Sequence, residues 1–157
     1  MTLEGTYELK ASPDRVWEAL NDSGVLAQCT PGCKQMVLAS DGSYDVLLEV
    51  GVAGIKGRYT GKITITDRVP GSQFRMMVTG NGSTGFIRAE GVIQLKGLDG
   101  RTVIEYSGQV QVGGPIAGVG QRVMGGVSKL MVRQFFQALE KAVVKTEDSP
   151  KATGDIS

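Results

Sequence analysis

The middle of the chain alternates apolar and polar residues with a period of two. Such alternation over four or more residues is typical of β-strands with one buried face. Asp-Gly and Asn-Gly pairs separate several of the alternating runs, which favours antiparallel hairpins. The sequence therefore predicts a first strand and then six successive ones, over residues 2–10, 36–39, 44–52, 56–69, 73–80, 86–96 and 102–112.

Two segments carry apolar residues at helical spacing instead. Ser12-Pro13 is an N-cap followed by proline, which predicts a short helix with Val16, Trp17 and Leu20 on its apolar face; a second short turn can follow. From Pro115 a long pattern begins, and it predicts one long amphipathic helix. Its apolar positions are Ile116, Val119, Val123, Val127, Leu130, Met131, Phe135, Leu139 and Val143.

The parity of four strands places apolar residues on one sheet face and polar residues on the other. An antiparallel sheet of this kind packs its apolar face on a covering element, and the long C-terminal helix is the one candidate. We therefore predict an α+β fold in which a curved seven-stranded antiparallel sheet wraps around that helix. Residues 1–145 form one domain in this interpretation, and 146–157 form a disordered polar tail.

The predicted inner face carries several small residues, among them Gly61, Ala89, Gly91 and Gly108. They leave room for a ligand or let helix and sheet pack closely, and both interpretations stay open. The hydroxyls of Tyr59 and Tyr106 can orient a ligand oxygen or find backbone partners. The candidate residues for an apolar pocket are Tyr59, Ile63, Phe74, Met76, Phe86, Gly91, Tyr106, Gly108, Val119, Val123, Met124, Val127 and Met131.

Composition removes several classes of function. The 17 Lys and Arg balance 16 Asp and Glu, which argues against nucleic-acid binding. The chain has no histidine, so Ser-His-Asp triads and histidine-ligated zinc are excluded. Cys29 and Cys33 are too few for a four-cysteine zinc site, and we interpret them as small apolar side chains beside a turn. No metal or cofactor is predicted.

The beginning of the sequence has no secretory pattern, and no stretch has the roughly 18–20 apolar residues of a membrane span. We expect a cytoplasmic protein. The same parity puts Glu49, Arg88, Glu90 and Glu105 on the outer sheet face, away from any internal site. We find no paired carboxylates and no phosphate-binding loop, so the sequence favours a binding protein over an enzyme.

Several motifs together resemble the CoxG family of carbon-monoxide dehydrogenase proteins, within the START and pollen-allergen-like superfamily. They cover residues 2 to about 145: residues 12–17 (SPDRVW), 29–33 (CTPGC), 56–62 (KGRYTGK), 85–86 (GF), 112–114 (VGG), 120–122 (GQR) and 134–136 (QFF). The resemblance implies a helix-grip fold with a hydrophobic cavity between sheet and helix. It also implies an accessory role near molybdenum-containing dehydrogenases, through membrane recruitment or handling of a quinone or similar lipid-like molecule.

Three hypotheses follow. The first is a non-catalytic binder of an apolar small molecule. The second is a docking, assembly or membrane-recruitment module for a dehydrogenase, with Arg58, Lys62, Arg75 and Arg88 as an outer patch. The third, which the lack of an inward acid or base disfavours, is a cyclase- or lyase-like enzyme.

Overall fold

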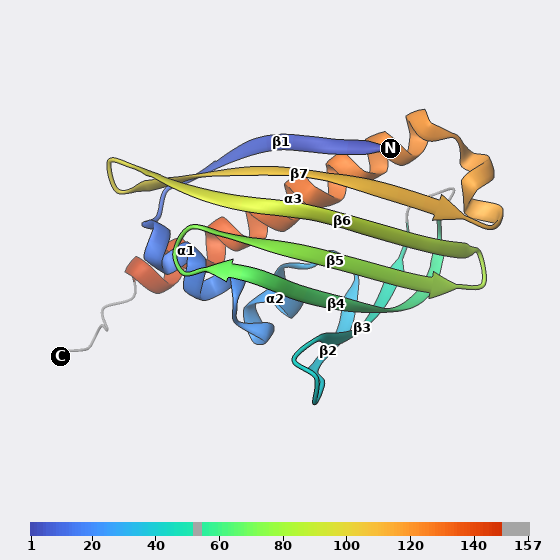
Figure 1. Cartoon of the computed structure of the whole chain (residues 1–157), viewed down its shortest axis with the longest axis horizontal. Coiled ribbons are helices and arrows are strands. Elements are labelled where there is room, and N and C mark those ends of the chain that lie inside the picture. The colour runs from blue at the N-terminus through green and yellow to red at the C-terminus, as the bar shows by residue number, and fades with distance from the viewer. Residues whose placement is uncertain (52–54, 149–157) are drawn as a thin grey trace.

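The computed structural model describes residues 1–51 and 55–148 (Figure 1). Seven strands form one antiparallel sheet in the order β1-β7-β6-β5-β4-β3-β2. The predicted helix-grip architecture is confirmed. The strands are β1 (Thr2–Leu9), β2 (Cys33–Leu38), β3 (Tyr44–Val50), β4 (Gly57–Val69), β5 (Gln73–Gly82), β6 (Gly85–Leu98) and β7 (Arg101–Gly113). The predicted strand residue Val52 lies outside the described residues.

The hairpin turns follow local backbone chemistry, with one correction. Between β4 and β5, Ser72 N donates to Val69 O at 2.9 Å across Pro70-Gly71, and Gly71 has φ 76°. That positive φ is one that glycine adopts without strain. Between β5 and β6, the Asn81-Gly82 pair predicted as a turn belongs to the strands, because Asn81 pairs with Phe86 and Gly82 with Gly85. Ser83 and Thr84 make the turn instead.

Two short helices follow β1. α1 (Pro13–Leu20) has Ser12 as N-cap, whose side chain accepts from Arg15 N, and Pro13 occupies the first turn. α2 (Ser23–Cys29) is capped by Asp22, whose carboxylate accepts from Gly24 N at 2.8 Å. Both caps satisfy amide groups that the first turn of a helix leaves unpaired. Two short helices here agree with the sequence-based prediction.

The long C-terminal helix α3 (Gln121–Asp148) begins six residues later than predicted. Pro115–Val119 form a separate 3-10 turn, η1, flanked by Gly114 at φ 78° and Gly120 at φ 95°. These positive φ values interrupt the helical path, so Ile116 and Val119 belong to η1 and not to α3. At its other end α3 extends to Asp148, two residues past Thr146 into the predicted tail; residues 149–157 lie outside the described residues.

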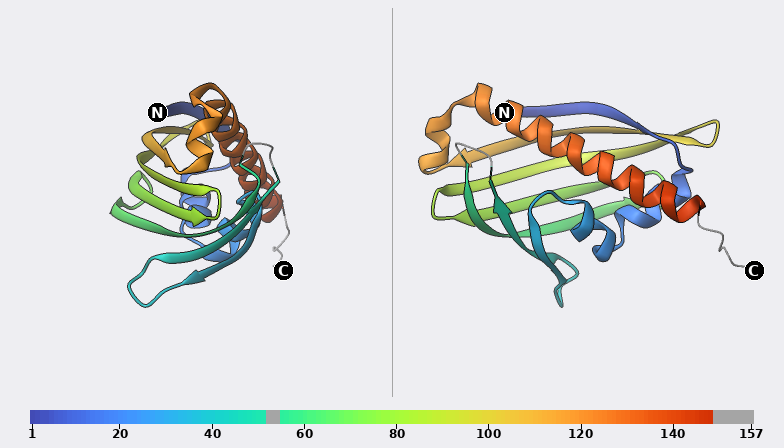
Figure 2. Two further views of the ribbon diagram at one scale, coloured as in Figure 1. Left: turned by 90° about the vertical axis from the view of Figure 1, so that its right-hand side faces the viewer. Right: turned by 180° about the vertical axis from the view of Figure 1, so that it is seen from behind.

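The sheet curls, and α3 crosses its concave side (Figure 2). The backbone of α3 comes close to β1, α1, α2 and η1. The short helices α1 and α2 lie at one end of the sheet, and η1 lies at the other (Figure 1). In the described part of the chain, no helix is both long enough and apolar enough to cross a membrane.

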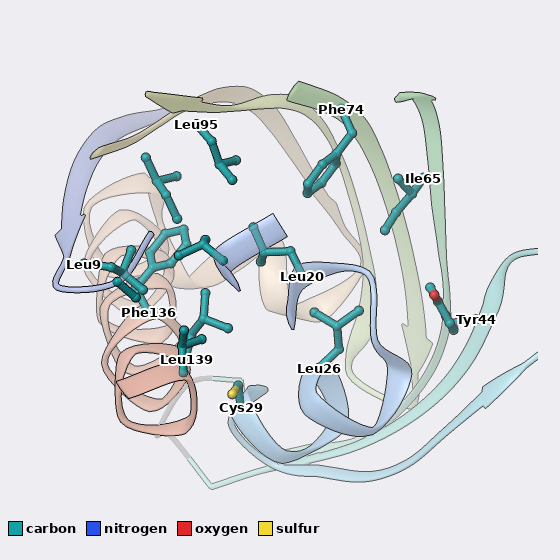
Figure 3. Packing of buried hydrophobic residues seen from close by; sticks show 14 of the residues in the cluster. Leu9, Leu20, Leu26, Cys29, Tyr44, Ile65, Phe74, Leu95, Phe136 and Leu139 are labelled. Atoms are coloured by element: carbon teal, nitrogen blue, oxygen red, sulfur yellow. The ribbon is translucent and has the colours of Figure 1, made fainter. Parts of the chain in front are cut away.

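Buried side chains form two clusters under α3. The first cluster lies around α1, α2 and the second half of α3 (Figure 3). Its buried residues include Leu9, Val16, Leu20, Ile104 and Leu139. The second cluster lies near η1 and consists of Ile55, Ile116, Met124 and Val127.

Candidate functional site

Six inward-facing side chains of β4 to β7, which we call the central band, remain partly exposed on the concave face. They are Ile63, Met76, Val78, Ala89, Ile93 and Tyr106. Strand register places them side by side, since Ile63 pairs with Val78, Val78 with Ala89, and Ile93 with Tyr106. The strand alternation predicted from the sequence therefore brings these residues together on one face.

Gly91 and Gly108 pair directly across β6 and β7 next to this band. A Cβ atom at Gly91 would lie 2.6 Å from Ser107 O, and one at Gly108 would lie 2.6 Å from Glu90 O. Both glycines are therefore required by the close approach of two strand backbones where the sheet bends. Of the two interpretations left open by the sequence, close packing holds for this pair.

Gly80 is the glycine that faces open space. It shares the parity of Phe74, Met76 and Val78, and a Cβ built on it would meet no atom within 4 Å. It pairs with Gly61 and with Ile87 of neighbouring strands, on the side toward the second cluster. A side chain at this position would extend under α3 without touching a backbone.

Tyr59 is buried, and its hydroxyl is already used within the protein. It donates to Ile55 O at 2.6 Å and lies 2.7 Å from Thr84 Oγ1. Thr84 O in turn accepts from Ile116 N at 2.7 Å. The Tyr59 side chain therefore joins β4, the β5–β6 turn and η1, and it does not offer a free group to a ligand.

Tyr7 and Tyr106 both pack their rings against Phe136 of α3, at centroid distances of 5.4 and 5.7 Å. Glu140 accepts a hydrogen bond from the Tyr7 hydroxyl. Burial, followed by the charge and hydrogen bond of Glu140, raises the pKa of Tyr7 above 10. The Tyr106 hydroxyl lies over Gly5, where a Cβ would be 2.6 Å from it, and it has no hydrogen-bond partner among the described residues.

Tyr44 presents a second free phenol. It projects inward from β3 beside Ile63 of β4 and is 6% exposed (Figure 3). Within residues 1–51 and 55–148 its hydroxyl also has no hydrogen-bond partner. A buried polar group without a partner is uncommon, because losing its hydrogen bonds to water costs free energy.

The predicted site residues on the helical side divide into three kinds. Met124 and Val127 are buried in the second cluster, while Met131 packs on it and stays partly exposed. Val119 lies on η1 and is partly exposed. Val123 is 43% exposed, so its prediction as a pocket residue is wrong, because α3 begins after Gly120 and turns this position to the surface.

Two predicted residues of the sheet also differ from the central band. Phe74 is buried in the first cluster, edge-on to Trp17 at 5.7 Å, and belongs to the filled core. Phe86 points to the outer face, where Arg88 lies 5.6 Å from its ring centroid and the ring covers Gly113. Parity explains the error: Ile87, not Phe86, shares the inner face with Ala89.

The outer sheet face is dominated by exposed ion pairs. Arg58 pairs with Glu49, Lys62 with Asp41 and Asp45, and Arg75 with Asp67 and Glu90. Three of the four cations predicted as a docking patch are therefore neutralised by neighbouring carboxylates. An open hollow of about 550 Å³ crosses β1, β7 and β6 on this face, and its polar lining suits water better than an apolar ligand.

The exposed face of α3 has the opposite character. Arg122, Lys129 and Arg133 are exposed at positions i, i+7 and i+11, which lie along one side of a helix. None of the three forms an ion pair within the described chain. The described part of α3 thus presents a stripe of unpaired positive charge.

The two thiols lie apart from the central band. Cys29 is buried in α2 and Cys33 begins β2; both are free, and burial raises the pKa of each. A raised thiol pKa lowers reactivity at neutral pH. This agrees with the interpretation of both as small apolar side chains.

Sequence reasoning missed three residues that shape this region: Tyr44, Gly80 and Glu140. Tyr44 shares the parity of Val46 and Leu48, and Gly80 that of Met76 and Val78, so alternation carried the signal for both. Glu140 follows Leu139 on the helix, and its partners Tyr7 and Lys10 N are more than 100 residues distant in sequence. Sequence spacing has no signal for such a contact.

A comparison with protein families matches residues 5–144 to the model described as CoxG, the G subunit of carbon monoxide dehydrogenase. The match covers nearly all of the described chain. The chain belongs to the CoxG family. The resemblance derived from the motifs is thereby confirmed, whereas no curated protein matches the chain.

Solved structures agree on the fold. A conserved protein from Geobacillus kaustophilus is 37% identical, with 93% of this chain and 97% of that chain covered and a TM-score of 0.91. A START superfamily protein from Mycobacterium smegmatis is 16% identical over 92% of this chain and 98% of that chain, with a TM-score of 0.73. This CoxG family member therefore has the START-like helix-grip fold.

Proposed function

We propose that this protein binds an apolar small molecule, quinone-like or lipid-like, between the central band and α3. The partly exposed central band carries this proposal. Apolar side chains on the concave side of a sheet beneath a helix are ordinarily buried by their neighbours. Side chains that stay accessible in that position border unfilled space, and an apolar ligand would remove them from water.

The chemistry of the inner face supports the same ligand class. The inward positions of β1 and β3 to β7 are apolar residues, glycines, tyrosines and one threonine. Tyrosine is the titratable side chain among them, which disfavours acid–base catalysis at neutral pH. The proposed role is therefore binding or carriage, in the cytoplasm, as an accessory to a molybdenum-containing dehydrogenase of the kind that the family name indicates.

Native mass spectrometry of the purified protein, followed by solvent extraction, tests the proposal first. We expect a defined apolar companion at about one per chain, or uptake of an added quinone or lipid by protein purified without one. A protein that is empty and takes up neither class of molecule would contradict the proposal.

A pair of variants then locates the site. Gly80→Met fills the open space beneath α3, whereas Thr79→Met adds the same side chain one residue earlier on the outer face. We expect Gly80→Met to weaken binding at least ten-fold and Thr79→Met to leave it unchanged. Gly91 and Gly108 are unsuitable for this test because their substitution strains the backbone.

A docking role has one observation in its favour, the unpaired stripe of Arg122, Lys129 and Arg133 on α3. Unpaired exposed cations favour an acidic partner surface and fast association. The matched comparison is charge reversal of this stripe against charge reversal of Arg58, Lys62 and Arg75. Loss of a dehydrogenase from a native-host pull-down with the first variant alone would support docking through α3; recovery of the enzyme with both variants would contradict it.

A further inference from the structure

The central band includes or adjoins two inward phenols, Tyr44 and Tyr106, whose hydroxyls have no hydrogen-bond partner in the described chain. They stand on β3 and β7, near opposite sides of the curled sheet. Two other inward phenols are satisfied: Tyr59 by Ile55 O and Thr84, and Tyr7 by Glu140. Free donors are therefore confined to two positions that face the proposed ligand space.

Their surroundings indicate the kind of group that they accept. A phenol offers one O–H donor to a neutral or anionic oxygen. The inward strand positions hold no arginine or lysine that could neutralise an anion. A carboxylate transferred into such a space would lose its hydration without gaining an opposite charge, at a high cost in free energy.

A ligand with no polar atom fits less well. It would cover the buried Tyr44 hydroxyl and leave it without either water or a protein acceptor, which weakens binding. A neutral oxygen, such as a ketone, quinone or ester carbonyl, satisfies the hydroxyl and needs no counter-charge. The energetic preference is thus for an apolar body that bears a neutral oxygen acceptor.

We infer that the hydroxyls of Tyr44 and Tyr106 donate hydrogen bonds to the ligand and select apolar molecules that carry a neutral carbonyl over hydrocarbons and fatty-acid anions. This inference rests on the proposed function, since it concerns the ligand of the same site. It assigns selectivity to two residues, of which Tyr44 carries no signal beyond strand parity in the sequence.

Two probes with one carbon skeleton separate hydrogen bonding from apolar burial. They are 2-methyl-1,4-naphthoquinone and 2-methylnaphthalene, and isothermal titration calorimetry gives both affinities. We expect the wild-type protein to bind the quinone more tightly. Tyr44→Phe and Tyr106→Phe should each lower quinone affinity about five-fold, the value of one ordinary hydrogen bond, and change hydrocarbon affinity less than two-fold.

Tyr7→Phe is the matched control for Tyr106→Phe. Both rings pack on Phe136, but the Tyr7 hydroxyl already serves Glu140, so its removal should not change the ratio of the two affinities. Dodecanoate against its methyl ester extends the test, and we expect the neutral ester to bind more tightly.

The outcomes distinguish this inference from the function on which it rests. Equal binding of both naphthalene probes, with neither phenylalanine variant altering their ratio, would overturn the inference and leave apolar binding intact. Binding of no probe by the wild-type protein would overturn both. A ratio that falls in Tyr44→Phe and Tyr106→Phe but not in Tyr7→Phe would support the assignment.

Discussion

Leu139 and Met131 project from the same helix two turns apart, but their surroundings differ. Leu139 is fully buried in the first cluster, where α1 and α2 supply Val16, Leu20 and Leu26 between α3 and the sheet. Met131 packs on the second cluster and remains partly exposed. The short helices thus fill one end of the concave face, and beyond them the sheet faces α3 directly. Folding stability and ligand space are assigned to different regions.

The largest expected effect separates these two regions. Leu139→Ala should lower the free energy of unfolding by about 2–5 kcal/mol, because it leaves a cavity in a filled core. Met131→Ala should cost about 1 kcal/mol or less, because its side chain already borders accessible space. Urea unfolding of both variants measures the difference, and equal losses would show that the two regions are packed alike.

The glycines of the concave face allow the next comparison. Gly108→Ala places a Cβ 2.6 Å from Glu90 O and 3.0 Å from Gly91 Cα, so it should cost about 1–3 kcal/mol. Gly80→Ala meets no atom within 4 Å and should stabilise the protein by about 0.5–1 kcal/mol through a less flexible unfolded chain. Thermal unfolding measures both changes. A stabilising Gly108→Ala would contradict the assignment of that glycine to the strand crossing.

These comparisons show which features of the molecule were accessible from the sequence. Alternation predicted the strands, their inner face and the exclusion of Glu49 and Glu105 from it, because strand parity is a local property. The start of α3 was wrong, since apolar spacing continues through η1 although Gly120 breaks the backbone path. The roles of Gly80, Gly91 and Gly108 depend on the neighbouring strand, and Tyr59 and Tyr106 differ only through partners distant in sequence.

The two tyrosines first considered as ligand contacts should also separate in stability. Tyr59→Phe removes the hydroxyl that serves Ile55 O and Thr84 and leaves a buried carbonyl without its donor, at a cost of about 1–2 kcal/mol. Tyr106→Phe removes a hydroxyl that has no described protein partner and should change stability by less than about 0.5 kcal/mol. Urea unfolding without ligand tests this pair. A comparable loss in both variants would mean that Tyr106 has a structural role.

The smallest effect concerns Tyr7 and Glu140 at the filled end. Glu140→Gln should cost about 1 kcal/mol at pH 8, where Glu140 accepts a hydrogen bond from the neutral Tyr7 hydroxyl. Because burial and Glu140 raise the pKa of Tyr7, the unfolded chain loses this proton from about pH 10 upward while the folded chain retains it. The contribution is therefore complete below pH 10 and declines as the pH rises through the pKa of the folded protein.

Urea unfolding of the wild type and Glu140→Gln between pH 8 and pH 11 measures this dependence. The stability difference should stay constant up to about pH 10 and then shrink, because the neutral glutamine does not oppose ionisation of Tyr7. A difference that grows above pH 10 would mean that Glu140 does not hold the Tyr7 proton. Tyr7 would then be another free phenol on the concave face, and the distinction between the filled end and the central band would fail at this position.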